Sequence, residues 1–299
     1  MQPFGERVAA AVASTGPLCV GIDPSQRLLH TWGLTDDAEG CRAFGEMCVE
    51  QLAGVVPAVK PQVAFFERHG AGGMVALERV LAAAREAGLL TIADAKRGDV
   101  GSTGEAYAAA WFDSPLAGDA VTATPYVGFG ALAPMVDSAR RTGRGLLVLV
   151  ASSNPEGRRL QEARTHDGRS VEAMLLAEIA ECNKAELAAA AGGSSVAARS
   201  VGSVGAVVGA TRAQPDNRAA ARARPEGELV GSLAAVGGVI LAPGLGAQGA
   251  TVSDVGTLFG ECPAGTVLPS ASRALLSTGP RRLARAAADL RDQLAAVLP

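Results

Sequence analysis

Three charged residues lie close together in the sequence, in the pattern Asp94-x-Lys96-x-x-Asp99. Apolar residues lead into them from Leu89, which is typical of a buried β-strand. Side chains two positions apart on a strand point to the same face, so Asp94 and Lys96 are predicted to lie side by side where the strand ends. Gly98 breaks the strand and directs Asp99 elsewhere. A carboxylate and an ammonium held together form a candidate site for proton transfer, whereas an exposed ion pair at a turn contributes little.

Eight short apolar segments are predicted to be strands, and the one that ends at Asp94 is the third. The segments are 18–24, 55–62, 89–94, 120–123, 145–150, 204–212, 238–244 and 265–269. Helices are expected between or around them at 6–14, 36–55, 73–87, 101–111, 131–142, 171–191 and 280–297. Strands that alternate with helices indicate a parallel sheet.

Eight such strands in a chain of 299 residues predict an α/β fold of the (β/α)8 TIM-barrel type. An open doubly wound sheet is the alternative, and it is disfavoured because no G-x-G-x-x-G pattern follows the first strand. No linker divides the chain, so we expect a single barrel domain over 1–299, with an inserted loop and helical region around 156–230. Within that region, 213–227 is rich in Arg and Pro and is interpreted as an exposed loop with helical pieces.

In a barrel of this type, catalytic groups gather at the carboxyl ends of the strands. Charged and polar residues stand at five of the predicted strand ends, namely Asp23, Lys60, Asp94 with Lys96, Ser153 and Arg273. Cations and anions alternate among them, so the group can share a water-poor pocket without an uncompensated charge. The sequence therefore predicts one polar site at the mouth of the barrel.

The turn after the seventh strand is a candidate phosphate site. It runs from Ala242 to Gly249 and contains three glycines, which can present backbone N–H groups to an anion. Arg273, after the eighth strand, adds a planar charged group that suits phosphate. The loops after the last two strands of a barrel frequently bind phosphate.

Composition and charge exclude several classes of function. The net charge is −3, so no global basic field favours nucleic acid, and the arginines between Arg212 and Arg224 are interpreted as a solvated loop. No run of 18 apolar residues predicts a membrane span, and the N-terminus lacks the layout of a signal peptide. Five scattered cysteines and three distant histidines argue against a metal site and favour the reducing cytoplasm.

With these motifs, the chain resembles orotidine 5'-phosphate decarboxylases of the longer bacterial type, type 2. The resemblance covers nearly the whole chain and rests on Asp94-x-Lys96-x-x-Asp99, supported by segments 21–24, 59–61, 243–248 and 271–273. It implies a (β/α)8 homodimer that converts orotidine 5'-monophosphate to UMP and CO2 in de novo pyrimidine biosynthesis. It also implies that no cofactor or metal takes part.

The resemblance further implies the roles of the catalytic residues. Lys96 would protonate C6 of the pyrimidine as the carboxylate leaves, and Asp94 would lie against that carboxylate. Lys60 would bind the ribose and hold Asp94 in place. Asp99 and Thr103 would be lent across the dimer interface to the site of the neighbouring subunit.

The resemblance assigns the substrate-binding residues as well. Asp23 would bind ribose hydroxyls, and Ser153 would contact the pyrimidine. The phosphate would be held by Gln248 and Arg273, in a loop formed by Pro243, Gly246 and Gly249.

Two rival functions stay open from the sequence. One is a related barrel decarboxylase that acts on a keto-sugar phosphate. It shares the Asp-x-Lys-x-x-Asp pattern but uses Mg²⁺ and an acidic residue where this chain has Lys60. The other is a barrel that binds a phosphosugar or nucleotide without catalysis.

Overall fold

The computed structural model describes residues 2–191, 200–213 and 228–299. The predicted loop over 213–227 therefore lies outside the described residues, apart from Ala213. Among the described residues, no helix is long and apolar enough to cross a bilayer.

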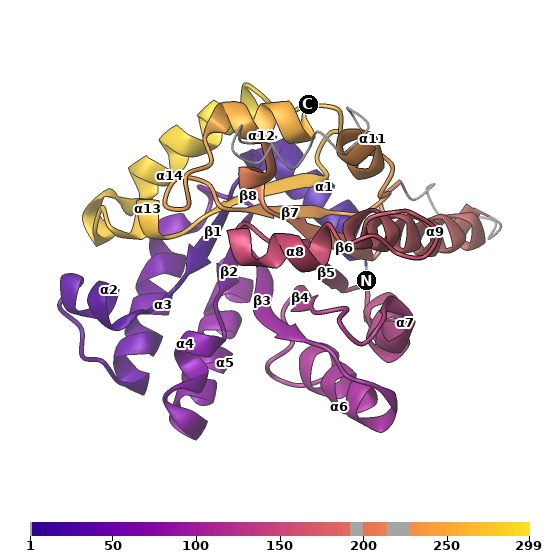
Figure 1. The fold of residues 1–299 in the computed structure, drawn as a ribbon. Coiled ribbons are helices and arrows are strands. Elements are labelled where there is room, and N and C mark those ends of the chain that lie inside the picture. Colours follow the sequence, from indigo (N-terminus) through magenta and orange to yellow (C-terminus); the bar gives the residue numbers. More distant parts are fainter. Residues whose placement is uncertain (1, 192–199, 214–227) are drawn as a thin grey trace.

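Eight parallel strands follow one another around a closed barrel, with β8 beside β1 (Figure 1). They are β1 (Cys19–Ile22), β2 (Ala58–Pro61), β3 (Leu90–Arg97), β4 (Ala120–Ala123), β5 (Gly145–Ala151), β6 (Val204–Val208), β7 (Ile240–Pro243) and β8 (Val267–Ala271). All eight predicted strands are thus present, and the prediction of a (β/α)8 barrel is confirmed. The open doubly wound alternative is wrong, because β1 pairs with β2 on one side and with β8 on the other.

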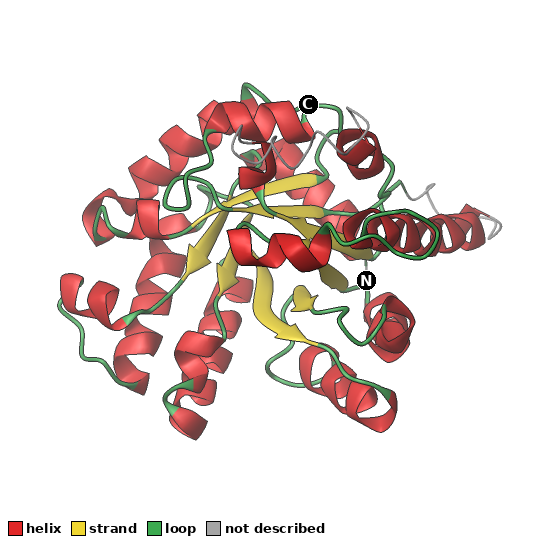
Figure 2. Cartoon of the chain, viewed as in Figure 1, coloured by secondary structure: helices red, strands yellow, loops and turns green. Residues whose placement is uncertain are grey.

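Helices surround the strands on the outside of the barrel (Figure 2). The longer ones are α1 (Phe4–Thr15), α3 (Ala38–Leu52), α5 (Gly70–Glu86), α6 (Gly101–Phe112), α7 (Ala133–Thr142), α9 (Val171–Ala191), α12 (Val252–Phe259) and α14 (Pro280–Ala295). Shorter ones are α2 (Gln26–Thr31), α4 (Ala64–Glu67), α8 (Arg158–Gln161), α11 (Glu228–Ala234) and α13 (Arg273–Leu276), with 3-10 turns η1 (Phe129–Leu132), η2 (Pro155–Gly157) and η3 (Ala210–Ala213).

The helical pattern of the sequence missed α12, between β7 and β8. It is a helix of 8 residues, too short for a clear repeat of apolar positions. Its start is nevertheless well defined, because Thr251 and Asp254 exchange side-chain and backbone hydrogen bonds in a capping box. A capping pattern was therefore the signal that could have located this helix.

Apolar residues along the strands alternate between two clusters, one on each face of the sheet. Val20 packs in the large cluster between strands and helices. Its neighbour Cys19 packs with Ile92, Leu147 and Leu268 in a smaller cluster. The alternation follows from the two faces of a strand, so the smaller cluster fills the inside of the barrel.

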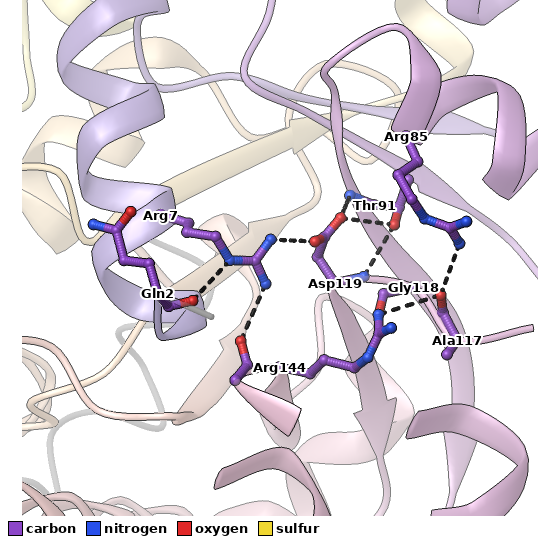
Figure 3. A network of polar contacts seen from close by, with 9 residues as sticks. Gln2, Arg7, Arg85, Thr91, Ala117, Gly118, Asp119 and Arg144 are labelled. Atoms are coloured by element: carbon purple, nitrogen blue, oxygen red, sulfur yellow. Dashed lines mark hydrogen bonds and ion pairs between the residues drawn. The ribbon is translucent and has the colours of Figure 1, made fainter. Parts of the chain in front are cut away.

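Helix α1 closes the amino-terminal end of the barrel. Phe4 and Val8 belong to the interior cluster, and Phe4 is only 1% exposed. Gly145 leaves room for that ring, since a Cβ there would lie 2.2 Å from Phe4 Cδ1. Arg7 of the same helix pairs with Asp119 (Figure 3), and it donates to the Gly143 carbonyl at 3.1 Å. The helix is therefore anchored by both packing and charge.

Asp119 in turn holds the start of β3. Its Oδ2 accepts hydrogen bonds from the Thr91 backbone N–H at 2.8 Å and from Thr91 Oγ1 at 3.0 Å (Figure 3). Arg85 and Arg144 donate to the adjacent carbonyls of Ala117 and Gly118. This polar network lies at the end of a barrel where residues usually serve stability.

We expect Phe4→Ala to lower the free energy of unfolding by about 3–5 kcal/mol, because the substitution leaves a cavity under the barrel interior. Denaturant titration measures the change. Val75→Ala is the control, since Val75 is 56% exposed and its truncation should change stability by about 0.5 kcal/mol or less. Equal effects of the two substitutions would contradict the closure of the barrel by α1.

Candidate active site

A cavity of about 450 Å³ opens at the carboxyl ends of the strands. Its lining includes eight of the residues predicted from the sequence: Asp23, Lys60, Asp94, Lys96, Ser153, Pro243, Gln248 and Arg273. They come from both halves of the chain, and the closure of the barrel brings them together. Gly246 and Gly249 belong to the same loop as Gln248 but do not line the cavity, and neither do Asp99 and Thr103.

Three charged side chains form the centre of the cavity. Lys60, at the end of β2, places Nζ 2.7 Å from Asp94 Oδ2. Lys96 places Nζ 2.6 Å from Asp94 Oδ1, so one carboxylate is shared between two ammonium groups. The prediction that Asp94 and Lys96 lie side by side is confirmed.

Exposure differs within this group. The side chains of Lys60 and Asp94 are 9% and 10% exposed, whereas that of Lys96 is 44% exposed. Lys60 and Asp94 thus form the floor, and Lys96 is the cation that a ligand in the cavity can reach.

Charge, not burial, sets the protonation of the two buried groups. Burial favours neutral Asp94, but attraction to Lys60 and Lys96 outweighs it and holds the pKa of this carboxyl well below its usual range. Burial likewise opposes the charged form of Lys60, but Asp94 and Asp23 outweigh it and raise the pKa of this amine above its usual range. Both groups are therefore charged at neutral pH.

Strand β3 does not end at Asp94 as predicted, but continues to Arg97. Its pairing with β4 is interrupted after Ala93 and resumes at Arg97, which lies opposite Ala123. A single residue of β4, Thr122, lies opposite the interruption. Thr122 is a site residue that the sequence analysis missed, and its signal was a hydroxyl within an otherwise apolar strand.

Asp23 lines the cavity next to β1. Its Oδ2 accepts a hydrogen bond from Ser272 Oγ at 2.7 Å, which fixes the carboxylate against the loop after β8. Its Oδ1 is buried and has no hydrogen-bond partner among the described residues.

The loop after β7 turns through three glycines, Gly244, Gly246 and Gly249, with φ of 106°, 73° and 99°. Such positive φ values strongly favour glycine. The amides of Gly246 and Gly249 donate within the loop, to Ala250 and Gly246 carbonyls at 2.9 and 2.8 Å. These two amides are therefore paired within the loop, and the glycines give the turn its shape.

This turn places Gln248 beside Ser153. Ser153 Oγ donates to Gln248 Oε1 at 3.0 Å, which joins the loops after β5 and β7. Arg273 is exposed and begins α13 directly after β8. The three side chains line the cavity with polar groups on the side of β5, β7 and β8.

Asp99 and Thr103 face away from this cavity. Asp99 Oδ1 accepts a hydrogen bond from the Val100 amide at 2.8 Å, and Thr103 is exposed on α6. Gly98 permits the turn, since a Cβ there would lie 2.2 Å from the Thr124 carbonyl oxygen. The prediction that Asp99 points elsewhere than Asp94 and Lys96 is thus met.

Arg212 corrects one interpretation of the sequence. It is not solvated: its side chain is 2% exposed, pairs with Glu172 of α9 and lies 3.0 Å from Glu162. The carboxylates offset the cost of burying the guanidinium. The neighbouring Thr211 donates to the Ser153 carbonyl at 3.0 Å, which fixes η3 against the loop that lines the cavity. The arginines at 218, 222 and 224 lie outside the described residues.

Within the described parts of the chain, no group of three or more His, Cys, Asp or Glu side chains is arranged to hold a metal ion. The cysteines described are all free thiols. Cys19 lies inside the barrel, and burial raises the pKa of its thiol to about 12.

Comparisons with known proteins agree on one family. A sequence model of the orotidine 5'-phosphate decarboxylase / HUMPS family matches residues 16–284. The orotidine 5'-phosphate decarboxylase of Salinispora arenicola is 48% identical over 97% of this chain and 95% of its own length. That of Streptomyces coelicolor is 46% identical over 97% and 95%.

Solved structures show the same likeness. The crystal structure of a Streptomyces avermitilis homologue, 43% identical, has a TM-score of 0.83 and covers 100% of this chain and 96% of its own. The OMP decarboxylase of Leishmania donovani, 27% identical, has a TM-score of 0.72 and covers 98% and 99%.

The pKa shifts of Asp94 and Lys60 predict how the stability of the fold depends on pH. The pKa of Asp94 is lowered on folding, so its ionisation stabilises the fold above about pH 4, and this contribution is lost as the pH falls through the folded pKa. The pKa of Lys60 is raised, so its contribution is present below about pH 10 and is lost as the pH rises.

We expect Asp94→Asn to lower the free energy of unfolding by about 3 kcal/mol at pH 7, and the difference to shrink below pH ~4.

Urea titrations between pH 3 and 8 measure this difference. Asp289→Asn is the control, because Asp289 is 65% exposed and should change stability by about 0.5 kcal/mol or less. A difference for Asp94→Asn that stays constant over the whole pH range would contradict the assignment of Asp94 as the buried anion.

Proposed function

The chain belongs to the orotidine 5'-phosphate decarboxylase / HUMPS family, and on that premise we propose how its side chains divide the work of the reaction. The reaction is the decarboxylation of orotidine 5'-monophosphate to UMP and CO2 in pyrimidine biosynthesis. The two rivals, a Mg²⁺-dependent keto-sugar-phosphate decarboxylase and a non-catalytic binding barrel, are not favoured, because the curated relatives over nearly the full length are orotidine 5'-phosphate decarboxylases.

Lys96 is the proton donor of this proposal. Loss of CO2 leaves negative charge at C6 of the pyrimidine, and a cation fixed beforehand stabilises that charge more in the transition state than in the substrate. Lys96 is the accessible cation of the central group, with Nζ anchored 2.6 Å from Asp94. It then delivers its proton to C6 and completes UMP.

The shared carboxylate of Asp94 is the single observation that carries this assignment. Each of its oxygens pairs with one ammonium group. Lys60 therefore holds Asp94 in place, and Asp94 in turn orients Lys96. Lys60 lies on β2, next to the strand that bears the other two. We assign Lys60 the further role of a ribose ligand.

The other cavity residues divide between the sugar, the base and the phosphate. The position of Asp23 in the cavity lining supports binding of a ribose hydroxyl, and that of Ser153 supports a contact with the pyrimidine. Gln248 and Arg273 are assigned to the phosphate, in the loop of Pro243, Gly246 and Gly249. Phosphate binding would draw that loop over the cavity and exclude water, which strengthens the charge interactions inside.

A homodimer would give Asp99 and Thr103 a function that they lack in one chain. They lie outside the cavity, next to Val100, which is 55% exposed. The loop after β4 packs against this segment and bears Tyr126 and Val127, which are 79% and 44% exposed. Exposed apolar residues around a polar pair favour a contact with a second copy, which would receive Asp99 and Thr103 at its own cavity.

Three further assignments belong to the proposal. Residues 1–299 form one barrel domain, and the extra residues around 156–230 lie on both sides of β6. The enzyme acts in the cytoplasm. It uses no cofactor or metal, and it binds neither nucleic acid nor a membrane.

Arg273→Ala should raise KM for orotidine 5'-monophosphate by about 10- to 100-fold, because a hydrogen bond to a charged group is worth about 1.5–3 kcal/mol. Steady-state kinetics measure the change, and Arg281→Ala, an exposed arginine of α14, is the matched control. The nucleoside orotidine, which lacks the phosphate, should be processed equally by both variants and the parent. An unchanged KM for the nucleotide would place the phosphate elsewhere.

Lys96→Ala and Asp99→Ala should each abolish turnover, measured by the loss of ultraviolet absorbance of orotidine 5'-monophosphate. Mixing the two variants under subunit exchange should restore about a quarter of the parent activity, because half of the dimers then carry one intact site. Turnover by Lys96→Ala alone would refute Lys96 as the proton donor. An active Asp99→Ala variant, or no recovery after proven exchange, would refute the sharing of Asp99.

A further inference from the structure

Thr122 lies at the point where the pairing of β3 and β4 is interrupted. Ala93 pairs with Val121, and the next pair is Arg97 with Ala123. Three residues of β3, from Asp94 to Lys96, therefore lie opposite Thr122 alone. The interruption is a β-bulge of three residues against one, and bulges redirect side chains next to active sites.

The bulge forces Lys96 into an unusual backbone conformation. Its φ is 49°, and it is the one non-glycine residue with positive φ among those that the structure describes. A side chain makes this region unfavourable by about 1–2 kcal/mol, so the surrounding contacts must hold the residue there. Bending the backbone in this way lets the Lys96 side chain turn back toward Asp94.

The hydroxyl of Thr122 contacts two of the three residues of the bulge, Lys96 and Asp94. The Lys96 backbone N–H donates to Thr122 Oγ1 at 2.9 Å. Thr122 Oγ1 also lies 2.9 Å from Asp94 Oδ1. A hydroxyl has one hydrogen, and the charged carboxylate can only accept, so Thr122 donates to Asp94.

We propose that Thr122 is a positioning residue for the proton donor, fixing the Lys96 backbone and the Asp94 carboxylate in one arrangement. The inference rests on the proposed role of Lys96. Thr122 is 1% exposed, so its hydroxyl stays directed at these two partners. Asp94 Oδ1 thereby receives two donors, the Lys96 ammonium at 2.6 Å and the Thr122 hydroxyl at 2.9 Å.

Loss of this hydroxyl would act on the chemical step. The Lys96 N–H would lose the Thr122 hydroxyl as its acceptor. Asp94 would keep Lys60 on Oδ2, but its Oδ1 would lose one of two donors, so the carboxylate and the ammonium that it orients could shift. A displacement of about 1 Å at a reacting group can lower a rate by about 10²-fold. The loop after β7 and Asp23 would be untouched, so binding of the nucleotide should persist.

The chain contains a matched control at the other end of the barrel. Thr91 is also 1% exposed and also lies on a barrel strand. Its hydroxyl accepts from the Asp119 backbone N–H at 3.0 Å and lies 3.0 Å from Asp119 Oδ2 (Figure 3). The same chemical group thus makes the same pair of contacts away from the cavity.

The test compares Thr122→Val and Thr91→Val, which replace a hydroxyl with a methyl group of nearly equal size. Thr122→Val should lower kcat by about 10- to 100-fold, with KM for orotidine 5'-monophosphate and the inhibition constant of UMP within about threefold of the parent. Thr91→Val should lower the melting temperature to a similar degree and leave kcat within about twofold. Thr122→Ser, which keeps the hydroxyl, should stay close to the parent.

A second pair of variants decides the question if Thr122→Val does not fold. Thr122→Ser and Thr122→Ala both lack the methyl group and differ only in the hydroxyl, so a lower kcat in Thr122→Ala alone supports the proposal. Equal kcat in this pair, or a loss of kcat in Thr91→Val as large as in Thr122→Val, overturns it. A rise in KM without a fall in kcat overturns it too. Lys96→Ala is assayed in parallel, because turnover by this variant would refute Lys96 as the proton donor.

Discussion

A buried carboxylate shared between two ammonium groups is the interaction on which the rest of the structure depends. Asp94 pairs with Lys60 through one carboxylate oxygen and with Lys96 through the other. Neither Lys60 nor Asp94 is stable alone where it lies, because removing an ion from water costs several kcal/mol without a partner. Strands β2 and β3, which bear these residues, must therefore meet in one register before the site exists. The barrel supplies that register, and the charged residues in turn make a shifted register of β2 against β3 unfavourable.

The sequence predicted the barrel and most of the cavity for a simple reason. Buried parallel strands are short apolar runs, and their carboxyl ends meet at one mouth, so Asp23, Lys60 and Asp94 could be placed together without coordinates. The pairing of Asp94 with Lys96 was predicted from the alternation of a regular strand. Yet the strand is irregular there, and Lys96 reaches Asp94 through a positive φ.

What the sequence did not reveal depends on partners far along the chain. The bulge exists because β4 offers one residue against three of β3, and neither segment shows this alone. Thr122 resembled any hydroxyl in a strand. Arg212 was interpreted as part of a solvated loop because the net charge of the chain is negative, whereas it is buried in an ion pair with Glu172 of α9. Local patterns report which residues are apolar, but they do not report which partner a polar residue meets.

The closure of the amino-terminal end of the barrel by α1 also sets an order of events during synthesis. Helix α1 precedes β1 in the sequence, yet Phe4 shares the interior cluster with Val239, Leu241 and Leu268, which are synthesised much later. The helix must wait for β7 and β8, so its docking is a late and non-local step. The amino-terminal end of the barrel therefore closes only after β8 has been made.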